Sequence, residues 1–309
     1  MDFSFTMTSS EPLQELVNYR YHTWHKHCNY LLDKFLVPYF QQGLYKTSPK
    51  NKRSIVLVEN RINKQWLFTA LHALLMCPSQ TAICFVCDNE SYQNANQFLA
   101  EHKIQLEAIW LSVENLSPDL NLSNLSDFNI LLKNSVFWNS LPHEHLLVFQ
   151  TDSLLIEPLP EFFFQFPYLG APFLPRQQSE YFQRRDLNGN ISGFFKVDTP
   201  IHGSPHVDVY PHLHGNGGLS IRHRELMSKI CEEFGLSSLS EEQEDVFFSR
   251  HISKYCQPPP LQIAKAFACE STYQQNSIGS HAAWKYFTSS ELAEHLDRQF
   301  RQVLSMTCL

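Results

Sequence analysis

The 309-residue sequence has no long Gly/Ser-rich or acidic run that would separate independently folding parts. A chain of this length can bury the core of one large α/β domain. Hydrophobic residues make up 43% of it, including 24 Phe and 12 Tyr, which is too much apolar surface for a disordered protein. We therefore expect one folded domain over residues 54–309, preceded by a helical extension and linker in residues 1–53.

A basic surface and long apolar runs are also missing. Lys and Arg are scattered and the formal net charge is −7, so the sequence offers no basic face that could follow a nucleic-acid backbone. No run of about 18 apolar residues occurs, which predicts that no transmembrane segment is present. The first residues lack the basic and apolar stretches of a secretory signal. We expect a cytoplasmic protein, and peripheral contact with a membrane stays open.

A second C-x-x-C pair, which would strengthen a zinc or redox interpretation of the first, is lacking too. The eight cysteines are widely spaced, and a cytoplasmic chain of this size needs no disulfides, so reduced thiols are expected. Cys84 and Cys87 form a single C-x-x-C motif in the strand-like run TAICFVCD, without a second pair. We interpret them as buried, small apolar side chains.

What the sequence does contain is an alternation of apolar and helical segments that begins after the linker. Apolar segments at 54–60, 81–89 and 106–111 alternate with helical patterns at 64–77 and 91–102. Strand, helix and strand in this order predict right-handed βαβ units. The predicted fold class is α/β, with a Rossmann-like, mostly parallel central sheet and helices on both faces.

The segments outside this alternation are also assigned from their patterns. We expect, in chain order, a helical region at 12–43, a linker at 47–54, a helix at 126–141, a strand at 145–159, a long loop region at 167–190, a turn, strand and helix at 214–235, a helix at 240–255 capped by Ser240 and Gln243, a strand at 264–271, a loop at 279–286 and a last helix at 289–304. Loops within 172–214 are expected to set the specificity.

Polar side chains follow the first two predicted strands. Glu59, Asn60 and Arg61 follow the first strand, and Asp88 follows the second. Ligands of open parallel sheets bind beyond the carboxyl ends of the strands, which makes these residues candidates for ligand contacts. Ordinary turns carry the same polar residues, so this alternative stays open.

The central motif is Gln150-Thr151-Asp152, which interrupts the most apolar strand of the chain. A carboxylate at the end of a buried strand is costly unless it meets a cation or several hydrogen-bond donors. A divalent metal with a diphosphate would supply that cation. A strand-end Asp that caps a turn explains the residue equally well from the local sequence.

Two further motifs combine backbone freedom with charge. Gly215, Gly217 and Gly218 permit close approach of the backbone, and Asn216 between them is suited to bind a hydroxyl group, although a tight turn would explain the glycines as well. The acidic pair of residues 244 and 245 falls in the first turn of a predicted helix. Carboxylates stabilise helix N-termini, so that ordinary role is the alternative.

Together these motifs carry a resemblance to a known family. In order and spacing they resemble the family known as domain of unknown function 5672, which is itself similar to glycosyltransferases of the GT-A fold. The likeness runs from about residue 54 to 286. Its motifs are QTDS (150–153), YLGAPF (168–173), GNGGLSIR (215–222), EDVFFS (244–249) and GSHAAWK (279–285), with VENR (58–61) and LLKNSVFW (131–138) as further parts.

The resemblance implies a GT-A-like domain with a metal-assisted donor site. The segment QTD occupies the place of the D-x-D motif, which puts Asp152 on the metal, with Gln150 in place of the first acid and Thr151 between them. Gln150 can hydrogen-bond a ribose hydroxyl but is a poor ligand for a hard cation. His281 matches the position of a second metal ligand, and its imidazole suits Mn²⁺ better than Mg²⁺.

The resemblance also implies roles for the remaining motifs. Asp245 matches the base that deprotonates the acceptor hydroxyl, with Glu244 orienting the acceptor or a loop. The donor is expected to be a UDP- or GDP-sugar and the acceptor a glycan or another hydroxyl compound. The donor contacts would come from Glu59, Asn60, Arg61, Asp88, Lys133, Asn216, Gly217 and Gly218, and Trp138 and Trp284 are candidates for stacking on a ring or for the core.

We therefore expect an inverting, metal-assisted glycosyltransferase, and two rivals remain. A sugar nucleotidyltransferase would carry a Gly-rich loop after its first strand, whereas VENRINKQW has no glycine. A non-catalytic module that binds a nucleotide-sugar or a glycan is favoured by Gln150 and disfavoured by the retained acids and His281.

Overall fold

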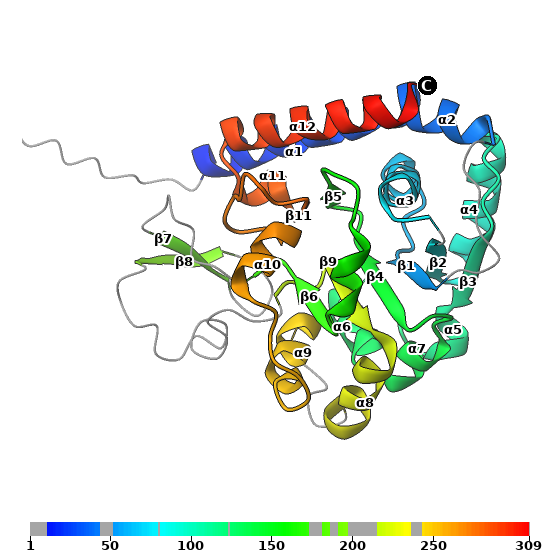
Figure 1. Cartoon of the computed structure of the whole chain (residues 1–309), viewed down its shortest axis with the longest axis vertical. Coiled ribbons are helices and arrows are strands. Elements are labelled where there is room, and N and C mark those ends of the chain that lie inside the picture. Colours follow the sequence, from blue (N-terminus) through cyan, green and yellow to red (C-terminus); the bar gives the residue numbers. More distant parts are fainter. Residues whose placement is uncertain are drawn as a thin grey trace, which may run out of the picture.

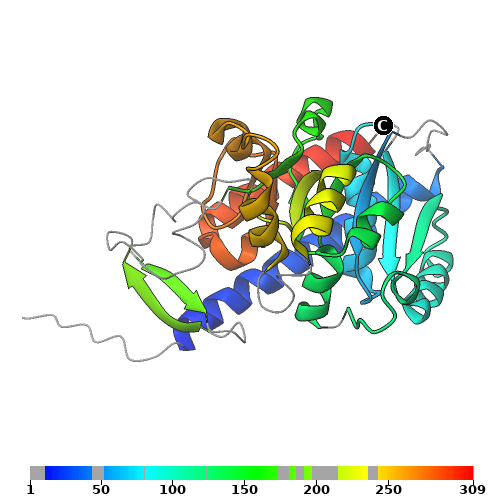
Figure 2. The ribbon, with the colours of Figure 1, turned by 90° about the horizontal axis from the view of Figure 1, so that it is seen from below.

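The computed structural model describes most of the chain. The described residues are 11–43, 52–79, 81–122, 124–172, 181–185, 191–196, 215–235 and 243–308. Ser240 and most of the predicted specificity loops at 172–214 lie outside them, as do residues 47–51 of the predicted linker. Two strands within 172–214, β7 (Tyr181–Arg185) and β8 (Ile191–Lys196), pair antiparallel (Figure 2).

A six-stranded sheet forms the centre of the molecule, in the order β3-β2-β1-β4-β9-β6 (Figure 1). The first four of these strands are mutually parallel, and β9 runs antiparallel to both of its neighbours. The predicted α/β class with a mostly parallel sheet is confirmed. The strands are β1 Arg53–Val58, β2 Thr81–Cys87, β3 Ala108–Ser112, β4 His145–Phe149, β6 Tyr168–Gly170 and β9 Leu219–His223.

A smaller three-stranded sheet lies beside it, in the order β10-β11-β5. Its strands are β5 Ser153–Leu155, β10 Ala268–Cys269 and β11 Gly279–His281. Strand β5 follows β4 after one turn, and β11 pairs with it antiparallel, so that His281 faces Ser153 across the pair. This pairing brings the segment around residue 281 to the carboxyl end of β4.

Helices surround both sheets. They are α1 Glu11–Leu31, α2 Val37–Gln41, α3 Lys64–Met76, α4 Asn89–Glu101, α5 Val113–Leu116, α6 Leu125–Leu132, α7 Ser135–Ser140, α8 Arg224–Phe234, α9 Glu244–Ile252, α10 Leu261–Phe267, α11 Ala283–Tyr286 and α12 Ser289–Thr307, with a π-helical turn η1 Leu32–Leu36 and a 3₁₀ turn η2 Glu161–Gln165.

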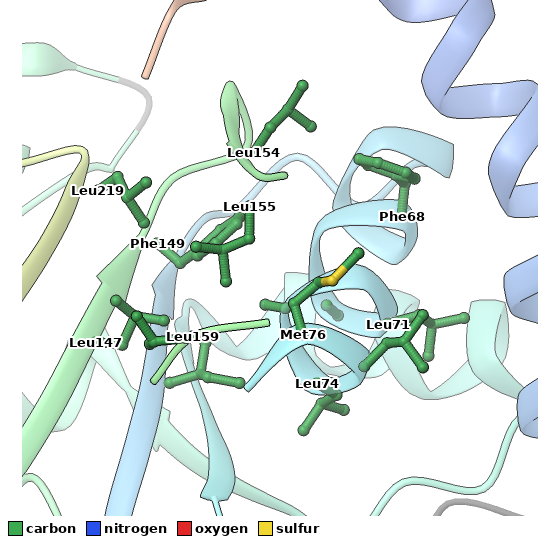
Figure 3. Close-up of a cluster of buried hydrophobic side chains, with 14 of the residues drawn as sticks. Phe68, Leu71, Leu74, Met76, Leu147, Phe149, Leu154, Leu155, Leu159 and Leu219 are labelled. Carbon is green, nitrogen blue, oxygen red and sulfur yellow. The ribbon is translucent and has the colours of Figure 1, made fainter. Parts of the chain in front are cut away.

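Alternate residues of the central strands supply two separate hydrophobic cores. In β1, Ile55 and Leu57 face the core that contains α3, whereas Val56 faces the core that contains α7 and α8. Successive side chains of a strand point to opposite faces, so a continuous apolar run serves both. Figure 3 shows the first core where side chains of α3 meet those of β4 and β5.

The N-terminal helix α1 belongs to the first of these cores. Trp24 and Leu31 are buried there, and α1 contacts α3, α11 and α12. Figure 1 shows α1 and α12 lying along the same side of the molecule. Residues 11–41 are therefore helical, and α1 packs on helices of the chain that follows.

The C-x-x-C motif lies within β2, as predicted. Cys84 and Cys87 are both buried and free. Residues three apart in a strand point to opposite faces, which keeps these two side chains from forming a shared site. Burial raises the pKa of each thiol to about 12, so both stay protonated near neutral pH.

Two predicted elements are each divided in the structure. The predicted helix at 126–141 is two helices, because α6 ends at Leu132 and the Asn134 side chain accepts a hydrogen bond from the backbone of Val136 at the start of α7. The predicted strand at 145–159 is two strands, because the chain turns at Gln150, where the Ser153 amide donates to its carbonyl.

Four predictions were wrong in type or boundary. The predicted loop region at 167–190 contains the strands β6 and β7. Residues 264–271 form the end of α10 and the short β10 rather than one strand, and the predicted loop at 279–286 contains β11 and α11. The helix predicted at 240–255 begins at Glu244 and ends at Ile252, and its N-cap Gln243 makes no capping hydrogen bond through its side chain.

Candidate active site

Asp152 and His281 face each other at the carboxyl end of β4. Their atoms Oδ1 and Nε2 are 3.1 Å apart, with 34% of the Asp152 side chain and 12% of the His281 side chain exposed. Although burial opposes the charged forms, the mutual attraction lowers the pKa of Asp152 and, with Glu270, raises the pKa of His281 to about 10.

Backbone hydrogen bonds fix this pair from both sides. The amide of Gln150 donates to the carbonyl of Gly218 at 2.8 Å, and the amide of Ala282 donates to the carbonyl of Asp152 at 3.0 Å. Ala282 has a φ of +48°, a left-handed conformation that alanine adopts rarely and at a cost in free energy. The strained turn lies directly after His281 and directs the chain from β11 into α11.

Glu270, which no sequence argument singled out, lies behind His281. Its Oε1 is 3.0 Å from His281 Nδ1 and accepts a second hydrogen bond, at 3.1 Å, from the side-chain amide of Asn216. A carboxylate on the far nitrogen of an imidazole fixes the orientation of the ring and increases its basicity. Glu270 thus connects the Asp152–His281 pair to the turn at residues 215–218, which we call the glycine turn.

Asn216 and Asp245 form the other end of the same chain of contacts. Asp245 Oδ2 accepts a hydrogen bond from the Gly217 amide at 3.2 Å and one from Asn216 Nδ2 at 3.5 Å. Burial, Glu244 and Glu270 together raise the pKa of Asp245 to about 7. This environment therefore poises the carboxyl group near neutrality, above the ordinary range of an aspartate.

The Glu244 carboxylate is paired with the buried guanidinium of Arg222 rather than with Asp245, Asn216 or Glu270. Arg222 donates to both carboxylate oxygens, at 2.6 and 2.9 Å, and its side chain is fully buried. The guanidinium lies over the rings of Tyr168 and Phe248. This contact holds the first turn of α9, and with it Asp245, against β9.

The glycine turn is required by the side chains that approach it. A Cβ at Gly218 would lie 2.3 Å from His281 Nε2 and 2.8 Å from Gln150 Oε1, and one at Gly217 would lie 1.9 Å from Glu244 Oε1. Such distances are far below van der Waals contact. Only glycine at these two positions leaves room for the His281 and Glu244 side chains. Together with Asp152, Asn216, Arg222, Asp245 and Glu270, these two side chains make up the polar cluster of the site.

The polar residues that follow β1 and β2 lie next to each other. Glu59 accepts hydrogen bonds from the backbone and guanidinium of Arg61, and Thr151 Oγ1 donates to it at 3.4 Å. Asn60 Oδ1 accepts from the Asp88 amide at 2.9 Å. The Thr151 contact joins this group to the motif at residues 150–152.

The remaining predicted residues divide into core and rim. Trp138 is fully buried and its indole donates to the Leu132 carbonyl, so it belongs to the core. Lys133 is buried at the end of α6, where its carbonyl lies against Gly235. Trp284, three residues after His281, is half-buried and packs edge-on against Tyr21 of α1, with ring centroids 4.9 Å apart.

The Asp152–His281 pair fits a divalent metal. Two neighbouring ligands of an octahedral ion, each held at about 2.1 Å, are separated by roughly 3 Å, and the two facing atoms are 3.1 Å apart. His281 Nε2 is buried without a well-aligned hydrogen bond. Among the described residues no group of three or more His, Cys, Asp or Glu side chains could hold an ion, and a two-residue site of this kind leaves positions for substrate phosphates.

The pattern of residues matches one protein family. The family described as "Protein of unknown function (DUF5672)" matches residues 110–281, more than half of the chain. The chain belongs to this family. The DUF5672 match ends at His281 and contains Asp152, Asn216 and Asp245, whereas β1 and β2 lie before it. The likeness was expected to run from about residue 54 to 286, so the match is shorter at both ends, mainly at its start.

Similar solved structures are transferases of two kinds. Mouse xyloside xylosyltransferase 1 in its apo form is 14% identical, over 66% of this chain and 82% of that one, with a TM-score of 0.38. The glycosyltransferase GlyE of Streptococcus pneumoniae TIGR4 is 11% identical, over 83% and 64%, with a TM-score of 0.36. The inositol-1-phosphate CTP transferase of T. maritima is 10% identical, over 82% and 97%, with a TM-score of 0.38.

These likenesses are too distant to assign an activity, since all three TM-scores are below 0.5. This chain also spans slightly less than two thirds of GlyE. No curated protein matches the sequence. None of the helices in the described part of this DUF5672 member is long and apolar enough to cross a membrane.

Sequence reasoning missed two residues of the cluster. Arg222 stands at the end of the GNGGLSIR motif, inside a strand, and an arginine within an apolar strand is a signal for a buried partner such as Glu244. Glu270 directly follows the two residues of β10, and nothing in the surrounding sequence indicates a buried partner for it. Its position becomes meaningful only when the β10–β11 pairing brings it next to His281.

Proposed function

We propose that this DUF5672 protein is a glycosyltransferase that moves a sugar from a nucleotide-sugar donor to a hydroxyl acceptor, with inversion at the anomeric carbon and with the help of a divalent metal. The observation that carries the proposal is the Asp152–His281 pair, whose facing atoms are 3.1 Å apart. The nucleotide is UDP or GDP, and the protein works in the cytoplasm or at the surface of a membrane.

Asp152 and His281 would hold the metal, with Mn²⁺ preferred to Mg²⁺ because a histidine nitrogen is one of the two ligands. When bound, the ion supplies positive charge that neutralises the leaving nucleoside diphosphate. Arg61 is a second cation for the phosphates, because 76% of its side chain is exposed and it is close enough to Asp152 for their charges to interact. Lys133 stays a candidate for the same task.

The nucleoside is assigned to the edge formed by the ends of β1 and β2. Gln150 and Thr151 would contact the ribose, with Glu59, Asn60 and Asp88 facing the base. The hydrogen bond from Thr151 to Glu59 supports this assignment, because it places the strand-end residues of β1 beside the metal-binding motif. Gln150 suits a hydroxyl partner, since its amide both donates and accepts.

Asp245 is the base in this mechanism. Its carboxylate takes the proton of the acceptor hydroxyl while the acceptor oxygen bonds to the anomeric carbon and the bond to the diphosphate oxygen breaks. A pKa of about 7 is well matched to this task, because the ionised fraction and the basicity are both substantial near neutrality. Glu244 contributes by orienting α9 through Arg222, and Asn216, Gly217 and Gly218 border the sugar.

Calorimetry with a panel of nucleotide-sugars, with and without Mn²⁺, tests the proposal. A UDP- or GDP-sugar should bind more tightly with Mn²⁺ than without it. Preference for a nucleoside triphosphate would instead indicate a nucleotidyltransferase, and a protein that binds no nucleotide would be a scaffold or a glycan-binding module.

Two substitutions separate the donor site from the base. Asp152→Ala should weaken donor binding, because it removes a metal ligand. Asp245→Asn should spare donor binding and lower transfer by a factor of about 10² or more, since general-base catalysis contributes about 10² to 10⁴. Equal donor affinity in Asp152→Ala and the wild type would contradict the assignment of the metal site.

A further inference from the structure

Glu270 joins two halves of the cluster through a single oxygen atom. Its Oε1 contacts His281 Nδ1 at 3.0 Å and Asn216 Nδ2 at 3.1 Å. His281 continues to Asp152, and Asn216 continues to Asp245, so the contacts form one unbroken chain. The Glu270 side chain is only 12% exposed, which leaves it little freedom to exchange these partners for water.

We propose that Glu270 is a positioning residue that sets both the metal affinity of His281 and the basicity of Asp245. This inference rests on the proposed function, because it assigns one residue to two steps of that reaction. Glu270 touches neither the donor nor the acceptor in this account. It acts through the imidazole on one side and through Asn216 and its own charge on the other.

Toward the metal, the carboxylate of Glu270 fixes which nitrogen of His281 faces Asp152. A hydrogen bond from Nδ1 to Glu270 leaves Nε2 directed at Asp152. A carboxylate in this position also makes the imidazole a stronger donor to a metal, and removal of such partners lowers metal affinity by about 10 to 100-fold.

Toward the base, Glu270 fixes the side-chain amide of Asn216. The side-chain nitrogen of Asn216 donates a hydrogen bond to Glu270, and its side-chain oxygen accepts one from the backbone amide of Gly218 at 2.7 Å. These two contacts determine which way the amide faces, so its nitrogen also lies toward Asp245, at 3.5 Å. The same residue therefore orients a donor to the proposed base.

The charge of Glu270 also acts on Asp245 directly. After burial, the negative charges of Glu244 and Glu270 raise the pKa of Asp245, whereas the Gly217 amide and the cation of Arg222 lower it. Arg222 also donates a hydrogen bond to the phenol oxygen of Tyr168 at 3.3 Å, so this phenol is a further titratable group close to the Glu244–Arg222 pair. Because Glu270 is one of two carboxylates in this balance, its neutralisation should lower the pKa of Asp245 below about 7.

Glu270→Gln is the test, because it removes the charge and keeps the shape. Binding of Mn²⁺ in the presence of UDP or GDP is followed by electron paramagnetic resonance of the free ion. We expect Mn²⁺ to bind about 10 to 100-fold more weakly than to the wild type. In addition, the acidic limb of the pH profile of sugar transfer should move to lower pH.

The matched control is Glu294→Gln. Glu294 is an exposed carboxylate that contacts Gln275 on the surface, so this substitution should change neither the Mn²⁺ affinity nor the pH profile.

Glu270→Asp separates charge from reach. The shorter side chain keeps its charge but withdraws its oxygen from His281, so Mn²⁺ affinity should again fall while the midpoint of the pH profile stays near that of the wild type. This variant also serves if Glu270→Gln lowers the melting temperature strongly. Unchanged Mn²⁺ affinity in both variants would overturn the inference and leave the proposed function intact. A wild-type protein that binds no Mn²⁺ with either nucleotide would overturn both.

Discussion

The guanidinium of Arg222 forms a two-pronged ion pair with the carboxylate of Glu244, at 2.6 and 2.9 Å, in the interior of the protein. Both side chains are buried, at 0% and 5% exposure. Although burial opposes its charge, the neighbouring carboxylates raise the pKa of Arg222 above its ordinary value. The pair joins β9 to the N-terminus of α9, and so it holds Asp245 beside the glycine turn.

Arg222→Met should destabilise the protein by about 3–5 kcal/mol, because it leaves the Glu244 carboxylate buried without a partner. The measurement is urea denaturation of the variant and the wild type. The double variant Arg222→Met with Glu244→Gln should recover part of the loss, since the unpaired charge is gone.

The surface pair of Arg301 and Asp297 provides the control for that experiment. Its atoms are also 2.9 Å apart, but the two side chains are 76% and 57% exposed. Arg301→Met should therefore change the free energy of unfolding by less than about 1 kcal/mol. Equal effects of the two arginine substitutions would mean that the buried pair is not a structural link.

Trp24→Ala tests whether helix α1 is part of the domain core. Trp24 is 1% exposed, and its loss from a packed core should cost about 3–5 kcal/mol. Tyr19→Ala on the same helix, where the side chain is 64% exposed, should cost less than about 0.5 kcal/mol. Thermal unfolding of the two variants gives the comparison, and a small effect at both positions would show that α1 only rests on the surface.

The alternation of strands and helices could be read from the sequence because each central strand is apolar on both faces. Residues 54–58 and 81–87 supply both hydrophobic cores, and such continuous runs are typical of buried parallel strands. The short segments after residue 260 were harder. Seven residues of α10 and two of β10 lack enough turns or alternations for their period to be recognised.

The candidate site was predictable in part for a similar reason. Asp152 stood out because a carboxylate ended an apolar strand, and Asp245 because it belonged to an acidic pair at a helix start. Glu270 carried no local signal, since its role depends on pairing between β10 and β11. The raised pKa of Asp245 was equally hidden, because it arises from burial and, besides the adjacent Glu244, from Glu270, which is distant along the chain.

The rate of sugar transfer should depend on pH through Asp245. The carboxyl group must lose its proton to act as a base, so kcat/KM should rise with pH and reach half of its plateau near pH 7. The same rate in Asp245→Asn should be low and without this rise. A wild-type profile that is flat from roughly two pH units below this midpoint to about one unit above it would argue against a base of this pKa.

Gly218→Ala tests the close approach of His281 to the glycine turn. The new Cβ would lie 2.3 Å from Nε2 of the imidazole, so His281 must leave the position in which it faces Asp152. We expect Mn²⁺-dependent donor binding to weaken by about 10-fold or more, in keeping with the loss of an oriented ligand.

Gly43→Ala is the control for the loss of a glycine. No atom lies within 4 Å of a Cβ at Gly43, although its φ of +65° makes alanine unfavourable there. This variant should lose about 1–2 kcal/mol of stability and keep its donor affinity. Unaltered binding in Gly218→Ala would show that His281 takes no part in holding the donor.

The most direct measurement is anomalous diffraction from a crystal of the wild-type protein grown with Mn²⁺ and UDP or GDP. The account predicts a Mn²⁺ peak within about 2.3 Å of both Asp152 Oδ1 and His281 Nε2, bridged to the diphosphate oxygens. A nucleotide bound elsewhere, or a diphosphate at this edge with the two side chains still paired to each other and no metal between them, would contradict it.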